Sequence, residues 1–87
     1  MGLIDDFQAA AVKSKEMTQR PSNEELLELY GLYKQATEGD NQEERPGGFN
    51  FVAIAKHDAW ATLTGKSKDD AMKAYVDLVN KLYQQYH

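Results

Sequence analysis

The sequence predicts an all-α protein, a four-helix bundle, from three observations. Apolar residues recur at the three- and four-residue spacing of a helix face, and no segment sustains the alternation of a half-buried strand. Helix-start and helix-end residues interrupt this pattern between the apolar segments. The 87 residues include no cysteine, so packed helices rather than disulfides must hold so small a chain together. We expect a single domain, 1–87, with helices over about residues 5–17, 22–38, 51–63 and 67–86.

The first expected helix has small residues on its buried face. Asp5 or Asp6 can cap it, and either favours the helix dipole. Its apolar face carries Phe7, Ala10, Ala11 and Ser14, with Lys15 at the edge. The small residues would let another helix or a ligand come close, and tight helix packing is the simpler interpretation.

The second expected helix is the most apolar and the centre of the prediction. Ser22 can cap it, Glu25 completes a capping box, and Gly39 is a natural residue after its end. One face carries Leu26, Leu27, Tyr30, Tyr33, Lys34 and Thr37. A second stripe of Leu29, Leu32 and Ala36 leaves a narrow polar wedge of Glu24, Gly31, Gln35 and Glu38. Such a helix either lies centrally in a bundle or faces both a core and a ligand.

A long connection separates the second and third helices. Residues 40–49 exceed the usual length of a loop between bundle helices, and so long a crossover permits the next helix to run parallel to the last. In the third helix Val52, Lys56, Trp60 and Leu63 share a face, which places a lysine within an apolar stripe. Ser67, with Asp70 three residues on, predicts the start of the fourth helix.

Composition excludes several function classes. The only histidines are His57 and His87, and no metal-ligand spacing or phosphate-binding glycine loop occurs, so we expect no enzyme and no metal or redox cofactor. The net charge of −4 disfavours nucleic acid but leaves room for one phosphorylated small ligand. No apolar run approaches the roughly 20 residues of a membrane span, and Asp5 follows too soon after the start for a signal peptide. We therefore expect a cytoplasmic monomer.

The remaining candidates for function are aromatic residues and cations, namely Tyr30, Tyr33, Lys34, Lys56 and Tyr75. Each alone is more often structural, because tyrosine and lysine commonly bury their apolar parts and leave the polar end in water. Together, ammonium and phenol groups suit a phosphate, and aromatic faces suit a purine. Apolar surface beside them suits a hydrocarbon chain. A phosphorylated nucleotide with an apolar tail would use all three.

These residues belong to segments that resemble the acyl-CoA-binding protein family over essentially the whole chain. The segments are Leu29-Tyr30-Gly31-Leu32-Tyr33-Lys34-Gln35-Ala36-Thr37 with Gly39-Asp40, Glu44-Arg45-Pro46-Gly47, Ala55-Lys56-His57-Asp58-Ala59-Trp60, Gly65-Lys66-Ser67 and Asp70-Ala71-Met72-Lys73-Ala74-Tyr75. Their order and spacing fit the family without an obvious gap.

The resemblance implies an up-down-down-up bundle that binds medium- to long-chain acyl-CoA thioesters without catalysis, as a carrier and pool buffer. Tyr30, Lys34 and Lys56 would contact the ribose 3′-phosphate, and Tyr33 would lie by the adenine. Contributions to the ligand site are also implied for Tyr75 and for Lys15, which would reach the head group. For the acyl groove our candidates are Leu26 and Leu27. Membranes or acyl-CoA-using enzymes would be transient contacts.

The chain departs from the family pattern before and after Lys56. His57 stands where the family usually has tryptophan, and we expect it to be partly exposed with no ligand role. Phe51-Val52-Ala53-Ile54 replaces a segment usually richer in lysine, and our hypothesis is that Val52 extends the apolar groove. An alternative interpretation is a helical interaction module whose groove takes a partner's amphipathic helix. That module would have no use for Tyr30, Lys34 and Lys56 as a phosphate clamp.

Overall fold

The computed structural model describes residues 2–86, and this part of the chain contains four α-helices and no strand. They are α1 (Leu3–Lys13), α2 (Asn23–Glu38), α3 (Phe51–Ala61) and α4 (Lys68–Tyr86). The all-α, four-helix prediction is confirmed.

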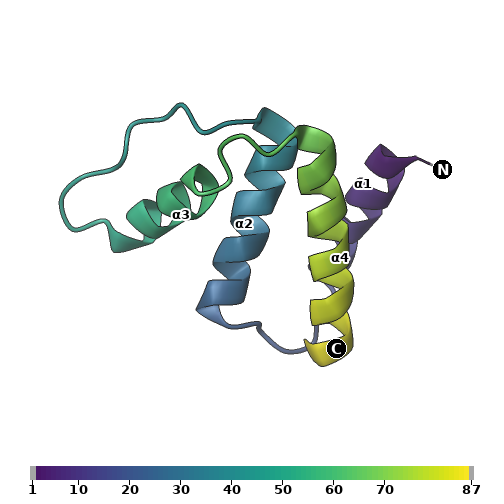
Figure 1. The fold of residues 1–87 in the computed structure, drawn as a ribbon. Coiled ribbons are helices and arrows are strands. Elements are labelled where there is room, and N and C mark those ends of the chain that lie inside the picture. Colours follow the sequence, from purple (N-terminus) through teal and green to yellow (C-terminus); the bar gives the residue numbers. More distant parts are fainter. Residues whose placement is uncertain (1, 87) are drawn as a thin grey trace.

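The helices form an up-down-down-up bundle (Figure 1). α2 packs against both α3 and α4, and α1 packs against α4. In Figure 1, α1 and α4 run in one direction and α2 runs in the opposite one, while the long connection carries the chain from the end of α2 to the outer end of α3. α3 then returns toward the top of α4 in the same general sense as α2, as so long a crossover permits.

The helix starts follow local sequence rules except at α1. Ser22 Oγ accepts from the Glu25 N–H at 3.1 Å and the Glu25 carboxylate accepts from the Ser22 N–H at 2.9 Å, which confirms the capping box. Ser67 Oγ accepts from the Asp70 N–H at 3.0 Å, as predicted. α1 instead begins after Gly2, with no side-chain cap. The prediction that an aspartate caps α1 was wrong; the acidic residues lie in its first turn, where they still favour the dipole.

Two helices end earlier than the sequence predicts. α1 stops at Lys13 rather than at residue 17, and α3 at Ala61 rather than at residue 63. A hydroxyl follows each end: Ser14 Oγ donates to the Ala11 carbonyl at 2.7 Å, and Thr62 Oγ1 donates to the Ala59 carbonyl at 2.8 Å. These side chains compete with backbone N–H groups for helix carbonyls. The backbone beyond them forms turns closed by hydrogen bonds between residues three apart.

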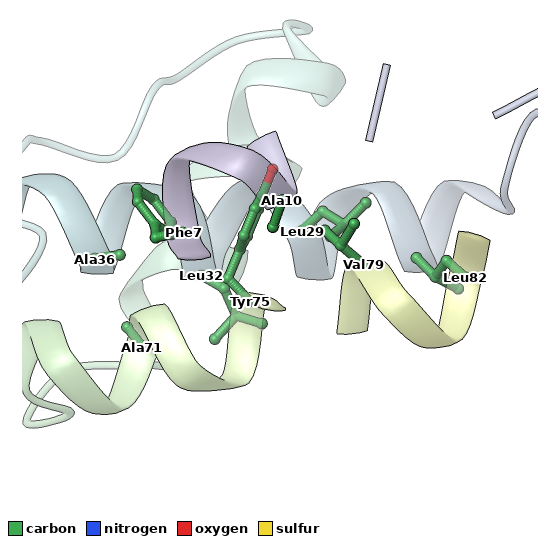
Figure 2. Close-up of a cluster of buried hydrophobic side chains, with 9 residues drawn as sticks. All are labelled: Phe7, Ala10, Leu29, Leu32, Ala36, Ala71, Tyr75, Val79 and Leu82. Carbon is green, nitrogen blue, oxygen red and sulfur yellow. The ribbon is translucent and has the colours of Figure 1, made fainter. Parts of the chain in front are cut away.

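The core is formed by three of the helices (Figure 2). Buried side chains from α1, α2 and α4 are Phe7, Ala10, Leu29, Leu32, Ala36, Ala71, Tyr75, Val79 and Leu82. Of the four described helices, α3 alone contributes nothing to this cluster, and it packs only against α2. Its buried Trp60 donates from Nε1 to the Gly39 carbonyl at 2.8 Å, which fixes the end of α3 to the end of α2. Surface depressions can therefore form on both sides of α2.

The polar wedge predicted for α2 is wrong at two positions. Gly31 is buried, and a Cβ there would lie 2.8 Å from the Ala59 carbonyl oxygen, so α2 and α3 pack nearly backbone to backbone. Gln35 is fully buried, and its Nε2 donates to Asp40 Oδ1 and to the Lys66 carbonyl, each at 2.8 Å. The amide thus ties the end of α2 to the segment that follows α3. Gly31 is covered because α3 crosses this face of α2, and Gln35 is buried beside Asp40 and the segment that follows α3.

Candidate functional site

Two adjoining clefts lie along α2 and together contain most of the predicted site residues. One, of about 340 Å³, lies between α1, α2 and α4 and is lined by Ala11, Ser14, Lys15, Leu26, Leu29, Tyr30, Tyr33 and Tyr75. The other, of about 380 Å³, lies between α2 and α3 and is lined by Arg20, Asn23, Leu26, Leu27, Tyr30, Phe51, Val52, Ala55 and Lys56. They share Leu26 and Tyr30, so one extended ligand can span both. We call them the α1–α2 cleft and the α2–α3 cleft.

The charge around these two clefts is the reverse of the charge of the whole chain. Among the described residues, no aspartate or glutamate lines either cleft. The charged groups there are the exposed cations Lys15, Arg20 and Lys56. In a chain with a net charge of −4, this separation produces a local positive potential that favours an anion.

A larger cleft, of about 510 Å³, lies elsewhere, between α2, α3 and α4. Glu24 and Glu28 line it together with Lys66, so its charges are mixed. A further depression beside Trp60 is lined by Glu38, Asp40 and Glu43. Carboxylates would repel a phosphate at either place. Volume therefore favours the cleft between α2, α3 and α4, whereas charge favours the α1–α2 and α2–α3 clefts. For an anionic ligand, charge is the criterion that selects the site.

Lys56 and Tyr30 meet where the two clefts join. The Lys56 ammonium lies 5.3 Å from the centre of the Tyr30 ring, within the range of a cation–π contact. Tyr30 comes from α2 and Lys56 from α3, so their meeting depends on the close packing of these helices at Gly31. The half-buried phenol and the exposed ammonium present two donors to the same space.

Lys34 is held outside both clefts. Its ammonium donates to the Glu38 carboxylate one turn along α2 and lies 4.8 Å from the centre of the Trp60 ring. The hydrogen bond that Lys34 donates to Glu38 raises the pKa of Lys34, against the opposing effect of burial, and keeps the ammonium charged. The structure therefore brings Tyr30 and Lys56 together, while Lys34 pairs with an acidic residue of its own helix.

Tyr33 and Tyr75 line the α1–α2 cleft, and both rings contact the buried ring of Phe7. Tyr33 stacks on Phe7 with ring centres 5.4 Å apart and is tilted toward Tyr75 at 5.8 Å. Tyr33 keeps 41% of its surface exposed, whereas Tyr75 is 5% exposed and belongs to the core. Burial raises the pKa of the Tyr75 phenol, opposed by a hydrogen bond with Ser14. Tyr33 thus has ring surface available for a flat ligand, and Tyr75 gives that ring a rigid support.

The structure adds cleft residues that the sequence did not indicate as site residues. Arg20 precedes the capping box of α2, and its Nη2 donates to Asn23 Oδ1 at 2.8 Å, which holds the guanidinium at the α2–α3 cleft. Phe51 and Ala55 line the same cleft from α3. Arg20 lies outside the periodic part of α2, so helical phase could not assign it to a face. It lies three residues before Asn23 and seven before Leu27, ahead of the start of α2, so the sequence offered no signal that places it at the cleft.

His57 attaches the long connection, residues 40–49, to α3. The side chain is partly exposed, as predicted, with 15% of its surface accessible. Nε2 lies 2.9 Å from the Glu43 carbonyl and Nδ1 lies 3.3 Å from Asp58 Oδ1, while the backbone carbonyl of His57 accepts from Asn41 Nδ2 at 3.2 Å. Asp58 also accepts two 3.0 Å bonds from Arg45. The connection is therefore fastened to α3 through His57 and Asp58, neither of which lines either cleft.

We predict that this attachment weakens as pH rises. The Glu43 carbonyl and then the Asp58 carboxylate raise the pKa of His57 above its ordinary value of 6.5, because the charged ring donates from both nitrogens. The extra stability is therefore full below the ordinary pKa and is lost as pH rises through the raised one. Between about pH 6 and about pH 8, the melting temperature should fall more for the parent chain than for His57→Gln. Parallel curves for the two proteins would contradict the role assigned to the histidine.

Comparison with known proteins identifies the family. A model of the family described as "Acyl CoA binding protein" matches residues 5–79. The chain belongs to the acyl-CoA-binding protein family. The acyl-CoA-binding protein of Brassica napus is 51% identical over 84 residues, covering 97% of this chain and 91% of that protein. The acyl-CoA-binding protein of Saccharomyces cerevisiae is 50% identical over 80 residues, covering 92% of each.

Solved structures of family members share the fold. The crystal structure of Oryza sativa acyl-CoA-binding protein 2 superposes with a TM-score of 0.92 at 45% identity, covering 97% of this chain and 93% of that one. The solution structure of acyl coenzyme A binding protein from yeast has a TM-score of 0.73 at 50% identity, covering 92% and 93%. Within the described part of the chain, no acidic, histidine or cysteine cluster suits a metal ion, and no helix is long and apolar enough to cross a membrane.

Proposed function

We propose that this chain binds medium- to long-chain acyl-CoA thioesters without covalent chemistry and acts as their carrier and pool buffer. The observation that carries the proposal is the pair of adjoining clefts, free of carboxylates among the described residues, with Lys56 and Tyr30 at their junction. Membership in the family supports it. The chain would act as a single binding domain, 1–87, and as a monomer in the cytoplasm.

The head group would occupy the junction and the α1–α2 cleft. Lys56 and Tyr30 would bind the ribose 3′-phosphate, joined by Lys34 once its ammonium leaves Glu38. The adenine would lie against the exposed face of Tyr33, supported by Tyr75. The exposed ammonium of Lys15, at the edge of the same cleft, would pair with phosphates of the head group.

The acyl chain would occupy the α2–α3 cleft. Leu26 and Leu27 line it from α2, and Phe51, Val52 and Ala55 line it from α3, which supports the proposal that Val52 extends the groove. Each buried methylene stabilises the complex by about 0.8 kcal/mol before ordering costs. The hydrocarbon chain then supplies much of the affinity, and the phosphate-binding groups provide selectivity for CoA esters over free fatty acids. A partner helix is the less favoured occupant, because it would leave the phosphate-binding cations unused.

Isothermal titration calorimetry with palmitoyl-CoA, CoA and palmitate tests the proposal. We expect one-to-one binding of the thioester and much weaker binding of CoA and of palmitate, because each fragment fills only one cleft. Palmitate binding as tightly as palmitoyl-CoA would contradict a two-part site. No binding of the thioester would overturn the proposed function.

We predict that Glu38→Gln tightens acyl-CoA binding. The Glu38 carboxylate competes with the ligand's phosphate for the Lys34 ammonium, and an exposed pair of this kind contributes up to about 1 kcal/mol. Its removal should lower the Kd for palmitoyl-CoA by about two- to fivefold. The matched control is Glu28→Gln, which removes one negative charge from the same helix at an exposed position outside both clefts. Equal effects of the two substitutions would mean that only net charge matters.

A further inference from the structure

One cation of the α2–α3 cleft has no part in the proposed function. Arg20 lines this cleft and does not line the α1–α2 cleft, where the head group would lie. Around it the cleft is largely apolar, with Leu26, Leu27, Phe51, Val52 and Ala55 among its lining residues. A guanidinium gains little from a hydrocarbon chain, whereas it forms strong, often bidentate hydrogen bonds with an anionic oxygen. The place of Arg20 therefore suits a ligand with an anionic group on its apolar part.

The segment that carries Arg20 is fastened at both ends. The Gln19 N–H donates to the Tyr86 carbonyl at 2.9 Å, and Thr18 Oγ1 donates to the same carbonyl at 3.2 Å. Figure 1 shows this connection passing the C-terminal end of α4. Arg20 Nη2 donates to Oδ1 of Asn23, which lies in the first turn of α2 and lines the same cleft. These bonds hold the guanidinium at the edge of the cleft.

The acidic residues of the flanking segments leave Arg20 available. Among the described residues Arg20 forms no ion pair. The Glu25 carboxylate accepts from the Ser22 N–H and from the Tyr86 hydroxyl, so it is already engaged. A guanidinium has five N–H donors, and the bond to Asn23 uses one of them. None of the glutamates before α2, on α2 or on the long connection lines the cleft, namely Glu16, Glu24, Glu25, Glu28, Glu38, Glu43 and Glu44.

Arg20 lies at the end of the cleft away from the head-group junction. Tyr30 and Lys56 mark the junction, and Asn23 precedes Tyr30 by about two helical turns, roughly 10 Å along the axis of α2. An acyl chain of the usual membrane length spans half of a bilayer core, about 15 Å. A chain that enters at Tyr30 and follows Leu26 and Leu27 can therefore bring its free end to Asn23 and Arg20.

We propose that Arg20, supported by Asn23, binds a carboxylate at the free end of the acyl chain. The ligand class is the CoA monothioesters of long-chain dicarboxylic acids. Such a carboxylate would lose water on entering an apolar cleft, and a guanidinium at the cleft edge offsets that loss. The inference rests on the proposed function, because it requires the acyl chain to lie in the α2–α3 cleft.

Calorimetry with three thioesters of equal chain length tests the inference. The probes are palmitoyl-CoA, the mono-CoA thioester of hexadecanedioic acid, and the methyl ester of that compound at its free carboxyl. Arg20→Gln should weaken binding of the carboxylate thioester by about fivefold, because the contact is at an exposed position. It should leave the affinities for palmitoyl-CoA and for the methyl ester near those of the parent. Lys73→Gln, which removes one exposed positive charge outside both clefts, is the matched control and should not change the preference.

Nitrogen–proton NMR of the arginine side chains reports the contact itself. The arginines of the chain are Arg20 and Arg45, and Arg45 is paired with Asp58, so its Nε–H signal is an internal reference. The carboxylate thioester should shift the Arg20 Nε–H signal more than palmitoyl-CoA or the methyl ester does, and should leave the Arg45 signal in place. A purely structural role of Arg20 would not make this shift depend on the end of the acyl chain.

The outcomes separate this inference from the proposed function. Equal losses of palmitoyl-CoA and carboxylate binding in Arg20→Gln would place Arg20 at the head group. No loss for the carboxylate thioester would mean that the end of the chain does not meet Arg20. Either result, in a parent protein that binds palmitoyl-CoA, overturns the inference and leaves the proposed function standing. Failure of the parent to bind any of the three thioesters overturns both.

Discussion

Lys56→Ala should weaken palmitoyl-CoA binding by roughly one to two orders of magnitude while the fold persists. A charge-assisted hydrogen bond contributes about 1.5–3 kcal/mol, and Lys56 is positioned to make one beside Tyr30. The fold should tolerate the change because Lys56 is exposed and its contact with the Tyr30 ring contributes only about 0.5–1 kcal/mol. Calorimetry measures the affinity, and thermal unfolding measures the fold.

A double cycle that combines the Lys56 substitution with removal of the ligand's 3′-phosphate tests whether the two groups interact. Palmitoyl-CoA and its 3′-dephospho analogue should differ strongly in affinity for the parent chain and only weakly for Lys56→Ala, because the phosphate and the ammonium act on each other. Lys73→Ala is the matched control, since Lys73 is an exposed lysine of α4 that lines neither cleft. Additive losses from the protein and the ligand changes would place the phosphate away from Lys56.

Gly31→Val should destabilise the protein by about 2–3 kcal/mol and weaken acyl-CoA binding as well. A Cβ at residue 31 would lie 2.8 Å from the Ala59 carbonyl oxygen and close to the Leu63 side chain, and neither backbone can yield without separating α2 from α3. That separation would also move Lys56 away from Tyr30 and open the α2–α3 cleft. Urea unfolding and palmitoyl-CoA calorimetry measure the two effects.

The control for this change is Gly47→Val. Gly47 has no atom within 4 Å of a Cβ position and does not adopt a positive φ, so a side chain there meets open space. It should leave both the unfolding free energy and the affinity near those of the parent. If Gly31→Val also left the unfolding free energy and the affinity unchanged, the close packing of α2 on α3 would not be what positions the site.

Local sequence rules predicted much of the fold. The capping box at Ser22, the Ser67 cap and the glycine after α2 are short-range signals that need no knowledge of neighbouring helices, and each is confirmed. The ends of α1 and α3 were misplaced because Ser14 and Thr62 bond back to helix carbonyls, a choice that periodicity does not reveal.

Helical periodicity did not predict which residues are buried by neighbouring segments of the fold. Helical periodicity predicts Gln35 to be a polar residue on an exposed wedge, yet it is fully buried, and its amide nitrogen donates to Asp40 and to the Lys66 backbone. Helical phase gives a residue's direction but not which element lies there.

The candidate site was predicted in part. Predicted site residues from α2 and α4 do line adjoining clefts, together with Lys15, which follows α1, and Lys56 from α3. The pairing of Lys34 with Glu38 follows the four-residue helical spacing and could have been anticipated from it. The place of Arg20 at the α2–α3 cleft could not have been anticipated, because Arg20 lies before the periodic segment. The ligand roles of these residues stay predictions.

The most direct test of the account is a map of backbone amide shifts in nitrogen–proton NMR spectra during titration with palmitoyl-CoA. We expect large changes at Tyr30, Val52 and Lys56 and at Ser14 and Tyr75, which surround the two clefts without carboxylates. Changes centred instead on Thr62, Ala74 and Leu78 would place the ligand in the larger cleft between α2, α3 and α4, and would contradict the claim that charge rather than size selects the site.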